Sequence, residues 1–150
     1  MSRLRTRIFH LAHVLMRPMT LGMRCAAFDG EGRVFLVRHT YVPGWYLPGG
    51  GVDAGETVEQ ALHRELREEG NLELLEAPGL VSIYFNRRAS RRDHVLFYVC
   101  RSVRQTAPKA PDREIAESGF FSLDALPEGT TASTRRRLTE LGGGARDPLW

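Results

Sequence analysis

The sequence contains very little cysteine, since Cys25 and Cys100 are the only two among its 150 residues. They stand far apart, each in an apolar, strand-like run, with no CxxC pattern and no nearby histidine. We therefore expect two buried free thiols, a reducing cytoplasmic setting and no zinc site of the Cys/His type. Long hydrophobic runs are also missing, because no apolar stretch approaches the roughly 20 residues that cross a bilayer. This composition predicts no membrane partner.

Lysine is nearly absent as well, since Lys109 is the only lysine among 21 basic residues. Arginine carries a planar fork of donors that suits phosphate oxygens, so the composition is compatible with an anionic substrate. Three short arginine groups, at 87–88, 91–92 and 135–137, could bind nucleic acid, but such groups more often face solvent. Because no nucleic-acid-binding motif accompanies them, nucleic acid is not the expected partner.

Acidic residues are absent before Asp29, and three arginines precede an apolar stretch over 8–16. This stretch is short, contains two histidines and lacks a small-residue cleavage site, so we expect a docking helix rather than a secretion signal. Its apolar residues recur at helical spacing, which predicts a helix over 3–17 that ends at Pro18.

The length suits one domain, so we expect residues 1–150 to form a single domain with a helical extension over 1–20. Two glycines within 29–32 favour a hairpin turn between the first two strands, and the segment 142–150 is expected to be a flexible tail. Apolar periodicity and glycine or proline breaks predict strands over 22–28, 33–39, 78–86, 94–103 and 119–123, and helices over 57–70 and 131–141.

The helix over 57–70 carries its glutamates in an unusual place. Thr57 and Gln60 have the spacing of a capping box at its start. At about 100° per residue, Glu65 and Glu69 fall inside the apolar stripe and Glu68 falls at its edge. Desolvating an unpaired carboxylate is costly, and glutamates three or four residues apart on a helix repel each other. A cation is therefore expected among them.

One arginine cannot neutralise three carboxylates, although Arg64 can pair with Glu68 at a spacing of four residues. A hard divalent ion such as Mg²⁺ prefers oxygen ligands and is commonly shared between carboxylates and substrate phosphates, and Mn²⁺ is a second option. The pattern therefore predicts a magnesium site on this helix.

A glycine-rich loop precedes the helix at a fixed distance. Gly50 is followed by five residues and Glu56, then by seven residues and the run Arg64-Glu65-Leu66-Arg67-Glu68-Glu69. This pattern closely resembles the Nudix box, G-x5-E-x7-R-E-U-x-E-E-x-G-U, in which U is an aliphatic residue. The departure from it is Asn71, which stands in place of the last glycine and can adopt the left-handed conformation that ends a helix.

The resemblance implies an α+β fold, an α/β/α sandwich around a mixed β-sheet. It also implies a hydrolase that splits the phosphoanhydride bond of a nucleoside diphosphate derivative, a small nucleotide. In the family, residues matching Glu65, Glu68 and Glu69 and the carbonyl of Gly50 bind divalent ions. By the same resemblance Arg64 orients the glutamates. The residues with structural roles in the box are Gly51, Glu56 and Asn71.

The general base and the substrate contacts stay open at this point. Glu65 is one candidate for the base, and Glu114, with Glu117 as its competitor, resembles the later-loop glutamate that some relatives use. Arg38 could contact phosphate or be an exposed residue at the end of a strand. Tyr41, Trp45 and Phe85 could stack on a base or belong to the core.

Two other functions compete with a small-nucleotide hydrolase. A non-catalytic binding module would use the same scaffold, but such modules usually lose glutamates that this sequence retains. An RNA 5′-end pyrophosphohydrolase would use the arginine groups for backbone contacts. Two copies could also pair through a sheet edge or the N-terminal helix to form a homodimer.

Overall fold

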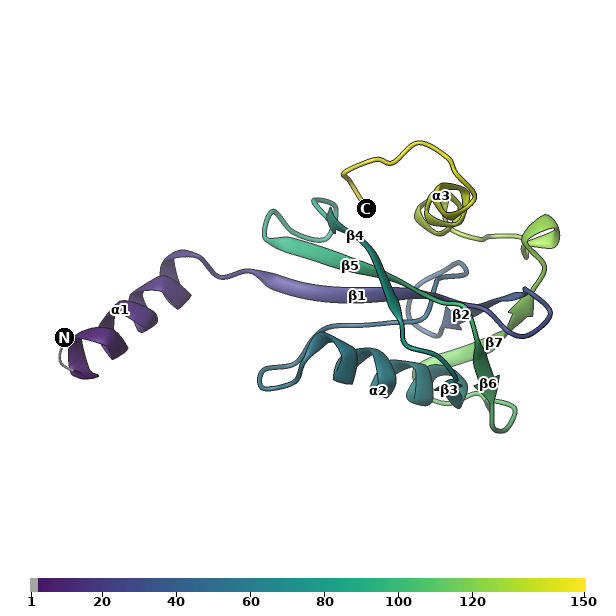
Figure 1. Cartoon of the computed structure of the whole chain (residues 1–150), viewed down its shortest axis with the longest axis horizontal. Helices are drawn as coiled ribbons and strands as arrows, with labels where there is room; N and C mark the ends of the chain where they lie inside the picture. The colour runs from purple at the N-terminus through teal and green to yellow at the C-terminus, as the bar shows by residue number, and fades with distance from the viewer. Residues whose placement is uncertain (1–2) are drawn as a thin grey trace.

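The computed structural model describes residues 3–150, and its first helix projects from a layered body (Figure 1). The helices are α1 (Arg3–Met16), α2 (Val58–Gly70) and α3 (Ala132–Leu141), with a short 3-10 helix over Leu123–Ala125. The strands are β1 (Thr20–Ala27), β2 (Val34–His39), β3 (Leu72–Leu74), β4 (Gly79–Phe85), β5 (Asp93–Cys100), β6 (Val103–Gln105) and β7 (Ile115–Phe121).

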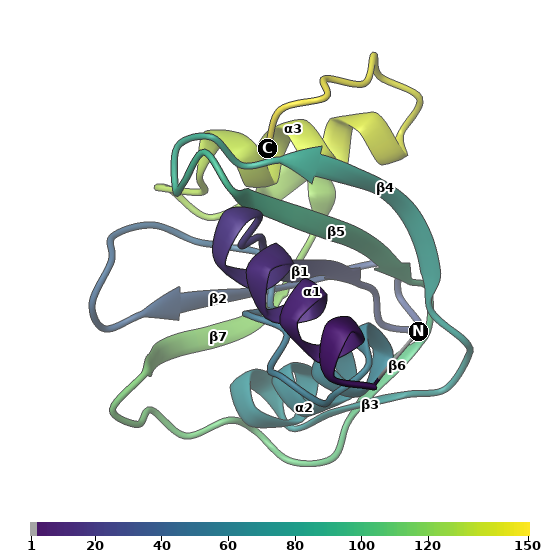
Figure 2. The same ribbon diagram turned by 90° about the vertical axis from the view of Figure 1, so that its left-hand side faces the viewer.

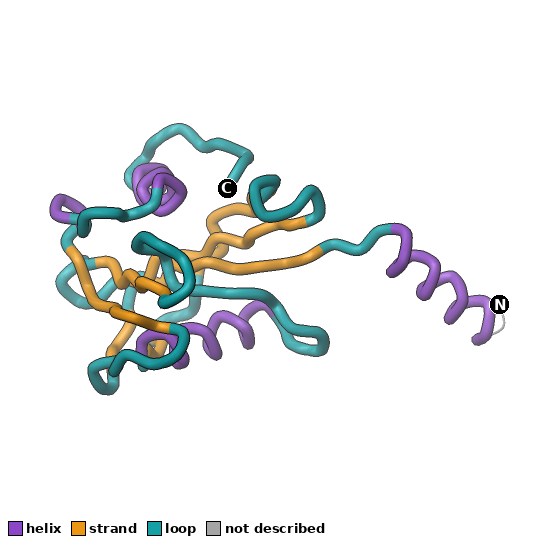
Figure 3. The backbone as a smooth tube through the Cα atoms, turned by 180° about the vertical axis from the view of Figure 1, so that it is seen from behind, coloured by secondary structure: helices purple, strands orange, loops and turns teal. Residues whose placement is uncertain are grey.

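The strands form a mixed sheet and two smaller pairs. β5 lies between β1, with which it is parallel, and β4, with which it is antiparallel. The pairs β2–β7 and β3–β6 are both antiparallel. Helix α2 lies on one side of these strands and α3 on the other, as Figures 1 and 3 show. This arrangement confirms the predicted α+β sandwich around a mixed sheet.

Two hydrophobic clusters hold the layers together, because the central strands bury both of their faces. Successive side chains of a strand point to opposite faces, so Phe35 and Val37 of β2 join the cluster against α2, and Val34 and Leu36 join the other. Helix α2 adds Leu62 and Leu66 to the first cluster, and α3 adds Leu138 to the second. Strands buried in this way read as continuous apolar runs.

The expected hairpin between the first two strands is wrong in its pairing. The turn forms, since the carbonyl of Asp29 accepts the N–H of Gly32 at 3.0 Å and Phe28 bridges Val34. Beyond the turn the strands separate: β1 aligns along its whole length with β5, and β2 pairs with β7. Turn residues fix a reversal of the chain, whereas the longer backbone ladders decide which strands pair.

Two short strands were missed, and one expected strand is divided. The run over 94–103 ends as β5 at Cys100, and Val103–Gln105 forms β6 opposite the equally short β3. Three residues are too few to display an alternating pattern. Strand β7 begins at Ile115, four residues before the expected start, because its backbone follows β2 with a register shift between Arg38 and His39.

The C-terminal segment, which was expected to be a flexible tail, makes backbone and aromatic contacts with the body. The N–H of Trp150 donates to the carbonyl of Phe85 at 3.1 Å, and Phe85 in turn donates to the carbonyl of Pro148 at 3.0 Å. The Trp150 ring lies 5.7 Å from the Tyr84 ring, centroid to centroid. Backbone pairing with the edge of β4 and the contact between Trp150 and Tyr84 thus hold this segment against the body. The glycines that precede it did not predict these contacts.

The two cysteines are free and buried as expected, but they are not isolated. Cys25 on β1 and Cys100 on β5 place their Sγ atoms 2.8 Å apart, because these strands are parallel neighbours. Burial, together with the neighbouring thiol, raises the pKa of Cys25 well above its usual value. Cys25 therefore remains in the thiol form at neutral pH.

Asn71 ends α2 in the left-handed conformation, with φ 52° and ψ 38°. Its backbone N–H donates to the carbonyl of Arg67 at 2.9 Å, and its side-chain amide donates to the carbonyls of Ala107 and Pro108. Asparagine thus replaces the glycine of the box without loss of the turn.

We expect Asn71→Ala to lower the free energy of unfolding by about 1–2 kcal/mol, because alanine pays the steric cost of the left-handed conformation. Asn71→Gly should cost less, since it keeps the backbone conformation and loses only the exposed amide contacts. Urea denaturation of both variants measures the difference. Equal losses in the two variants would show that the side-chain amide, and not the backbone conformation, is what matters.

Candidate active site

Helix α2 is anchored at its first turn by the predicted capping box. The hydroxyl of Thr57 accepts the N–H of Gln60 at 3.1 Å, and the Gln60 side chain accepts the N–H of Thr57 at 2.8 Å. Leu62 and Leu66 are almost fully buried against the sheet. These contacts fix the rotation of the helix, and with it the directions of Glu65, Glu68 and Glu69.

Arg64 braces the glycine loop against the helix. Its guanidinium donates to Glu65 Oε1 at 2.6 Å, to Glu56 Oε1 at 2.7 Å and to the carbonyl of Gly51 at 3.1 Å. Hydrogen bonding to Arg64 lowers the pKa of Glu56. Glu68 lies farther away, with its Oε2 atom 3.6 Å from Arg64 Nη1. Arg64 therefore pairs mainly with Glu65 and Glu56, rather than with Glu68 as its spacing suggested.

Glu69 is the most deeply buried of the three helix glutamates, with 3% of its surface exposed. Its Oε2 atom accepts the N–H of Gly49 at 2.7 Å, and burial raises its pKa to about 8 although the charge of Arg24 opposes the shift. His39 Nε2 lies 3.7 Å from Glu69 Oε1, which is too far for a hydrogen bond. Because burial also lowers the pKa of His39, both groups favour their neutral forms and do not form an ion pair.

The glycine loop fits closely against both β1 and α2. A Cβ at Gly49 would lie 2.2 Å from the carbonyl oxygen of Met23, and a Cβ at Gly50 would lie 2.4 Å from Glu65 Oε1. Arg24, an arginine within the apolar strand β1, donates to the carbonyl of Gly49 at 2.6 Å. Sequence reasoning missed Gly49 and Arg24, although a charged residue in an apolar strand was a usable signal.

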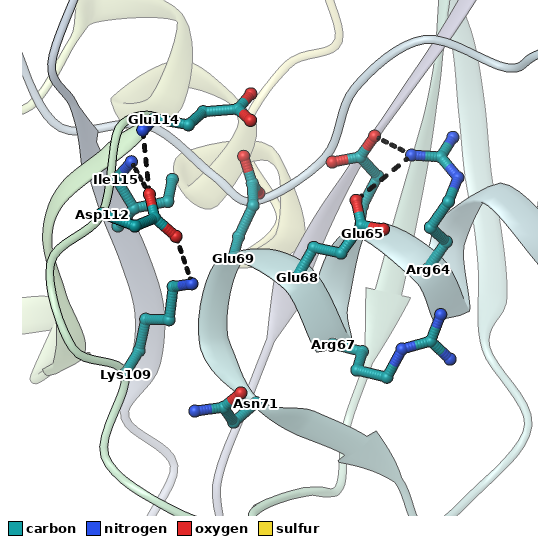
Figure 4. Close-up of a pocket in the computed structure, with 10 residues that line it drawn as sticks. All are labelled: Arg64, Glu65, Arg67, Glu68, Glu69, Asn71, Lys109, Asp112, Glu114 and Ile115. Atoms are coloured by element: carbon teal, nitrogen blue, oxygen red, sulfur yellow. Dashed lines mark hydrogen bonds and ion pairs between the residues drawn. The ribbon is translucent and has the colours of Figure 1, made fainter.

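A cavity of about 520 Å³ opens along the glutamate face of α2. Figure 4 shows Glu114, which follows the loop at Lys109–Asp112, extending over this cavity toward Glu69. Asp112 shapes that loop, because its Oδ1 atom accepts the N–H groups of Glu114 at 2.8 Å and Ile115 at 2.7 Å. The lining residues are Arg64, Glu65, Arg67, Glu68, Glu69, Asn71, Lys109, Asp112, Glu114 and Ile115.

Of the two later glutamates, only Glu114 reaches the cavity. Glu117 lies on β7 and pairs with Arg38 of β2, with Arg38 Nη2 2.7 Å from Glu117 Oε2. Both side chains of this pair are largely exposed, and neither lines the cavity. The place of Arg38 thus matches the exposed strand-end alternative and not a contact with phosphate in this cavity.

The aromatic residues expected to stack on a base lie elsewhere. Trp45 is 7% exposed and packs edge-on against Phe121, and Phe85 stacks on His94 beside the C-terminal segment. Tyr41 is exposed and lines neither this cavity nor the larger one described below. We therefore assign Trp45 to the core.

A second cavity of about 690 Å³ lies on the other side of the glycine loop, where Gly50 and Gly51 help to line it. Tyr46 and Trp150 are its aromatic residues, and Arg24, Asn86, Arg88 and Asp93 are among its polar ones. Its volume suits a small ligand. Because successive side chains alternate, Tyr46 lines this cavity while its neighbour Trp45 packs into the cluster on the other side of the sheet.

The donor atoms suit a hard cation, but they do not converge on one point. Among residues 3–150, no three histidine, cysteine, aspartate or glutamate side chains are placed together closely enough to hold an ion. Glu65 instead faces Arg64, and Glu69 faces the N–H of Gly49. Arg64 and the N–H of Gly49 thus stabilise two of the three carboxylates, a larger share than the single pair of Arg64 with Glu68 that the sequence suggested. Ion binding would require these side chains to rotate.

The raised pKa of Glu69 predicts how stability depends on pH without added metal. The folded chain keeps a proton that the unfolded chain releases above its ordinary pKa of 4.5, so the free energy of unfolding falls as the pH rises from about 4.5 to about 8. We expect Glu69→Gln to remove this contribution, because the amide oxygen can still accept from Gly49.

Urea denaturation in the presence of a chelator, at several pH values, measures how the free energy of unfolding depends on pH in the wild type and in Glu69→Gln. Glu68→Gln is the matched control, because Glu68 has a side chain that is 56% exposed. An unchanged pH slope in Glu69→Gln would show that another group is responsible.

Comparisons with known proteins show which family this chain resembles. The family model of the NUDIX domain matches residues 18–141. A protein of Bacillus subtilis (strain 168), provisionally named an 8-oxo-dGTP diphosphatase, is 31% identical over 129 residues, which cover 85% of this chain and 83% of that protein. The RNA pyrophosphohydrolase of Gluconobacter oxydans (strain 621H) is 45% identical over 58 residues, which cover 35% of this chain and 34% of that enzyme.

A solved structure extends the similarity to the fold. The crystal structure of a MutT NUDIX hydrolase from Burkholderia pseudomallei is 28% identical, with a TM-score of 0.68 over 81% of this chain and 97% of that chain. The names of these proteins point to different substrates. The similarity therefore indicates the fold and the class of bond that is hydrolysed, but it does not indicate one substrate.

Proposed function

This chain belongs to the Nudix family and is a hydrolase of phosphoanhydride bonds, and from that premise we propose that its substrate is a nucleoside diphosphate linked to a further group. The observation that carries the proposal is the cavity in which Glu65, Glu68 and Glu69 of α2 share one space with Glu114. Carboxylates gathered in this way suit a metal-bound diphosphate and the water that attacks it.

The proposed ligands of the metal are Glu65, Glu68, Glu69 and the carbonyl of Gly50. Their oxygens suit Mg²⁺, with Mn²⁺ as a substitute. The Gly50 carbonyl accepts the N–H of Met23 at 2.8 Å, and a carbonyl oxygen has a second lone pair for another partner. A divalent ion bound here would offset charge on the phosphate oxygens and lower the pKa of a bound water.

The protein's own residues position this site. Arg64 and Glu56 hold the glycine loop against α2, so that Gly50 stays beside Glu65. We assign the nucleoside part to the second cavity, where Tyr46 and Trp150 offer aromatic surfaces. Gly50 lines that cavity and faces Glu65 closely enough that a Cβ would clash with it, so a diphosphate crossing the loop would reach the glutamates.

Glu114 is our candidate for the residue that accepts the proton of the attacking water, with Glu65 as a second acceptor. A general base contributes about 10²–10⁴-fold to a rate, and we expect Glu114→Gln to lower kcat by only about tenfold because Glu65 remains. Glu117→Gln is the matched control, because Glu117 pairs with Arg38 outside the cavity. Equal effects of the two substitutions on kcat would remove Glu114 from the mechanism.

A hydrolysis panel tests the function itself. The chain is incubated with Mg²⁺, with Mn²⁺ or with a chelator, together with nucleoside triphosphates, nucleotide sugars, ADP-ribose and 5′-triphosphorylated RNA, and the products are identified. The proposal predicts metal-dependent release of a nucleoside monophosphate from a small nucleotide. Preferential cleavage of RNA would favour the RNA-end alternative, and the absence of turnover on every substrate would favour a binding module.

A further inference from the structure

Helix α1 stands clear of the rest of the molecule, as Figures 1 and 3 show, and in Figure 2 it projects toward the viewer in front of the body. Its large apolar side chains lie in solvent: Leu4 is 67% exposed, Ile8 59%, Leu11 62% and Leu15 72%. At 14 residues and about 1.5 Å per residue, the helix is about 21 Å long. The docking onto the body that the sequence suggested does not occur, so this apolar surface lacks a partner within residues 3–150.

The helix has distinct apolar and polar faces. At about 100° per residue, the four residues Leu4, Ile8, Leu11 and Leu15 fall within an arc of about 60°. Val14 and Met16 lie about 90–110° from its centre, and Phe9 borders the polar face beside His13. Arg5 and Arg7 flank the centre of this arc, and the opposite face carries Thr6, His10 and His13. No acidic residue precedes Asp29.

A second group of positive charges lies near the base of α1. The loop between β4 and β5 exposes Arg87, Arg88, Arg91 and Arg92, and no carboxylate of residues 3–150 forms an ion pair with them. The N–H of Thr20 donates to the carbonyl of Arg92 at 3.0 Å, and the Thr20 hydroxyl donates to Asp93 at 2.7 Å. The basic loop is therefore tied to the point where α1 leaves the body.

We propose that α1 and the basic loop 87–92 form a peripheral binding surface for anionic phospholipid bilayers. An interfacial helix typically carries large apolar residues on one face and arginines that reach the headgroups. No helix among residues 3–150 is long and apolar enough to cross a membrane. The proposed attachment is therefore reversible, with the helix along the surface, and it goes beyond the expectation of no membrane partner.

Charge and apolar area together favour an anionic bilayer over a second copy of this chain and over RNA. Two copies of α1 packed side by side would bring arginines together with no acidic residue from either helix to offset them. RNA would satisfy the arginines but would leave the apolar arc in water. An anionic bilayer satisfies both features at once.

Cosedimentation of the full chain with vesicles tests the proposal. We expect binding to vesicles of phosphatidylcholine mixed with phosphatidylserine, little binding to phosphatidylcholine alone, and weaker binding at high salt. Ile8→Gln with Leu15→Gln should abolish sedimentation, because glutamine preserves the helix and removes the centre of the apolar arc. Arg7→Gln and Arg91→Gln should each weaken binding about fivefold, the effect of one basic residue near a charged membrane.

The matched control is Thr6→Gln with His10→Gln, which changes the polar face and should leave sedimentation as it is. Nucleotide hydrolysis should be unaffected in all these variants, which shows that the body remains folded. Failure of the wild-type chain to sediment with phosphatidylserine vesicles would overturn the proposal. So would an apolar variant that converts a dimer to a monomer without changing vesicle binding, or one that loses RNA binding instead.

Discussion

Replacing Glu68 with glutamine is expected to lower kcat by at least about 100-fold, since even residues that only orient metal ligands cost about 10–100-fold when changed. Glu68 borders the glutamate cavity, and its side chain is 56% exposed. Its ion-pair contact is a distant one of 3.6 Å with Arg64, so the amide should not disturb the fold. The free energy of unfolding, measured by urea denaturation, should stay within about 0.5 kcal/mol of the wild type.

The matched control is Glu59→Gln, on the solvent face of the same helix. Both variants lose one carboxylate from α2, but only Glu68 faces the cavity. Steady-state kinetics with varied Mg²⁺ would distinguish the loss of a metal ligand from the loss of a surface carboxylate. Only a lost ligand raises the metal concentration needed for half-maximal rate. Full activity of Glu68→Gln at every metal concentration would exclude this residue as a ligand.

Gly49→Ala is expected to destabilise the chain by more than about 1–3 kcal/mol, the cost of a strained backbone conformation alone. Gly49 has φ +139°, which residues with a side chain rarely adopt, and its Cβ would lie 2.2 Å from a backbone oxygen of β1. Backbone in a buried strand cannot move aside as a flexible side chain can. Thermal and urea denaturation should both show the loss, together with loss of the hydrogen bond to Glu69.

The neighbouring glycines provide the controls. A Cβ at Gly51 meets no atom within 4 Å, so Gly51→Ala should leave stability nearly unchanged. A Cβ at Gly50 would meet the carboxylate of Glu65, which can rotate, so Gly50→Ala should fold and lose activity. Equal losses of stability in all three variants would show that the close approach of Gly49 to β1 is not what limits this loop.

The sequence by itself determined the helix that carries the site. Thr57 and Gln60 fixed where α2 begins, Asn71 fixed where it ends, and the 3.6-residue period placed Glu65 and Glu69 on the buried side. These features depend on contacts within about four residues, which is why they can be read from local spacing. The resemblance to the Nudix box rests on the same short segment.

Only the tertiary structure decided which distant residues meet this helix. Glu114 and Glu117 are three residues apart, yet the loop ordered by Asp112 sends Glu114 to the cavity while β7 holds Glu117 against Arg38. Partners of this kind are set by strand pairing and loop geometry, and no local pattern contains that information.

Strand pairing and loop geometry also explain the other contacts that the sequence did not predict. Arg24 reaches the glycine loop because the loop pairs with β1 through backbone hydrogen bonds, and Trp150 reaches the second cavity because the chain end pairs with Phe85. The apolar periodicity of α1 predicted a helix, but only the assembled body left that face without a partner. Local spacing thus set helix α2, and long-range packing set what surrounds it.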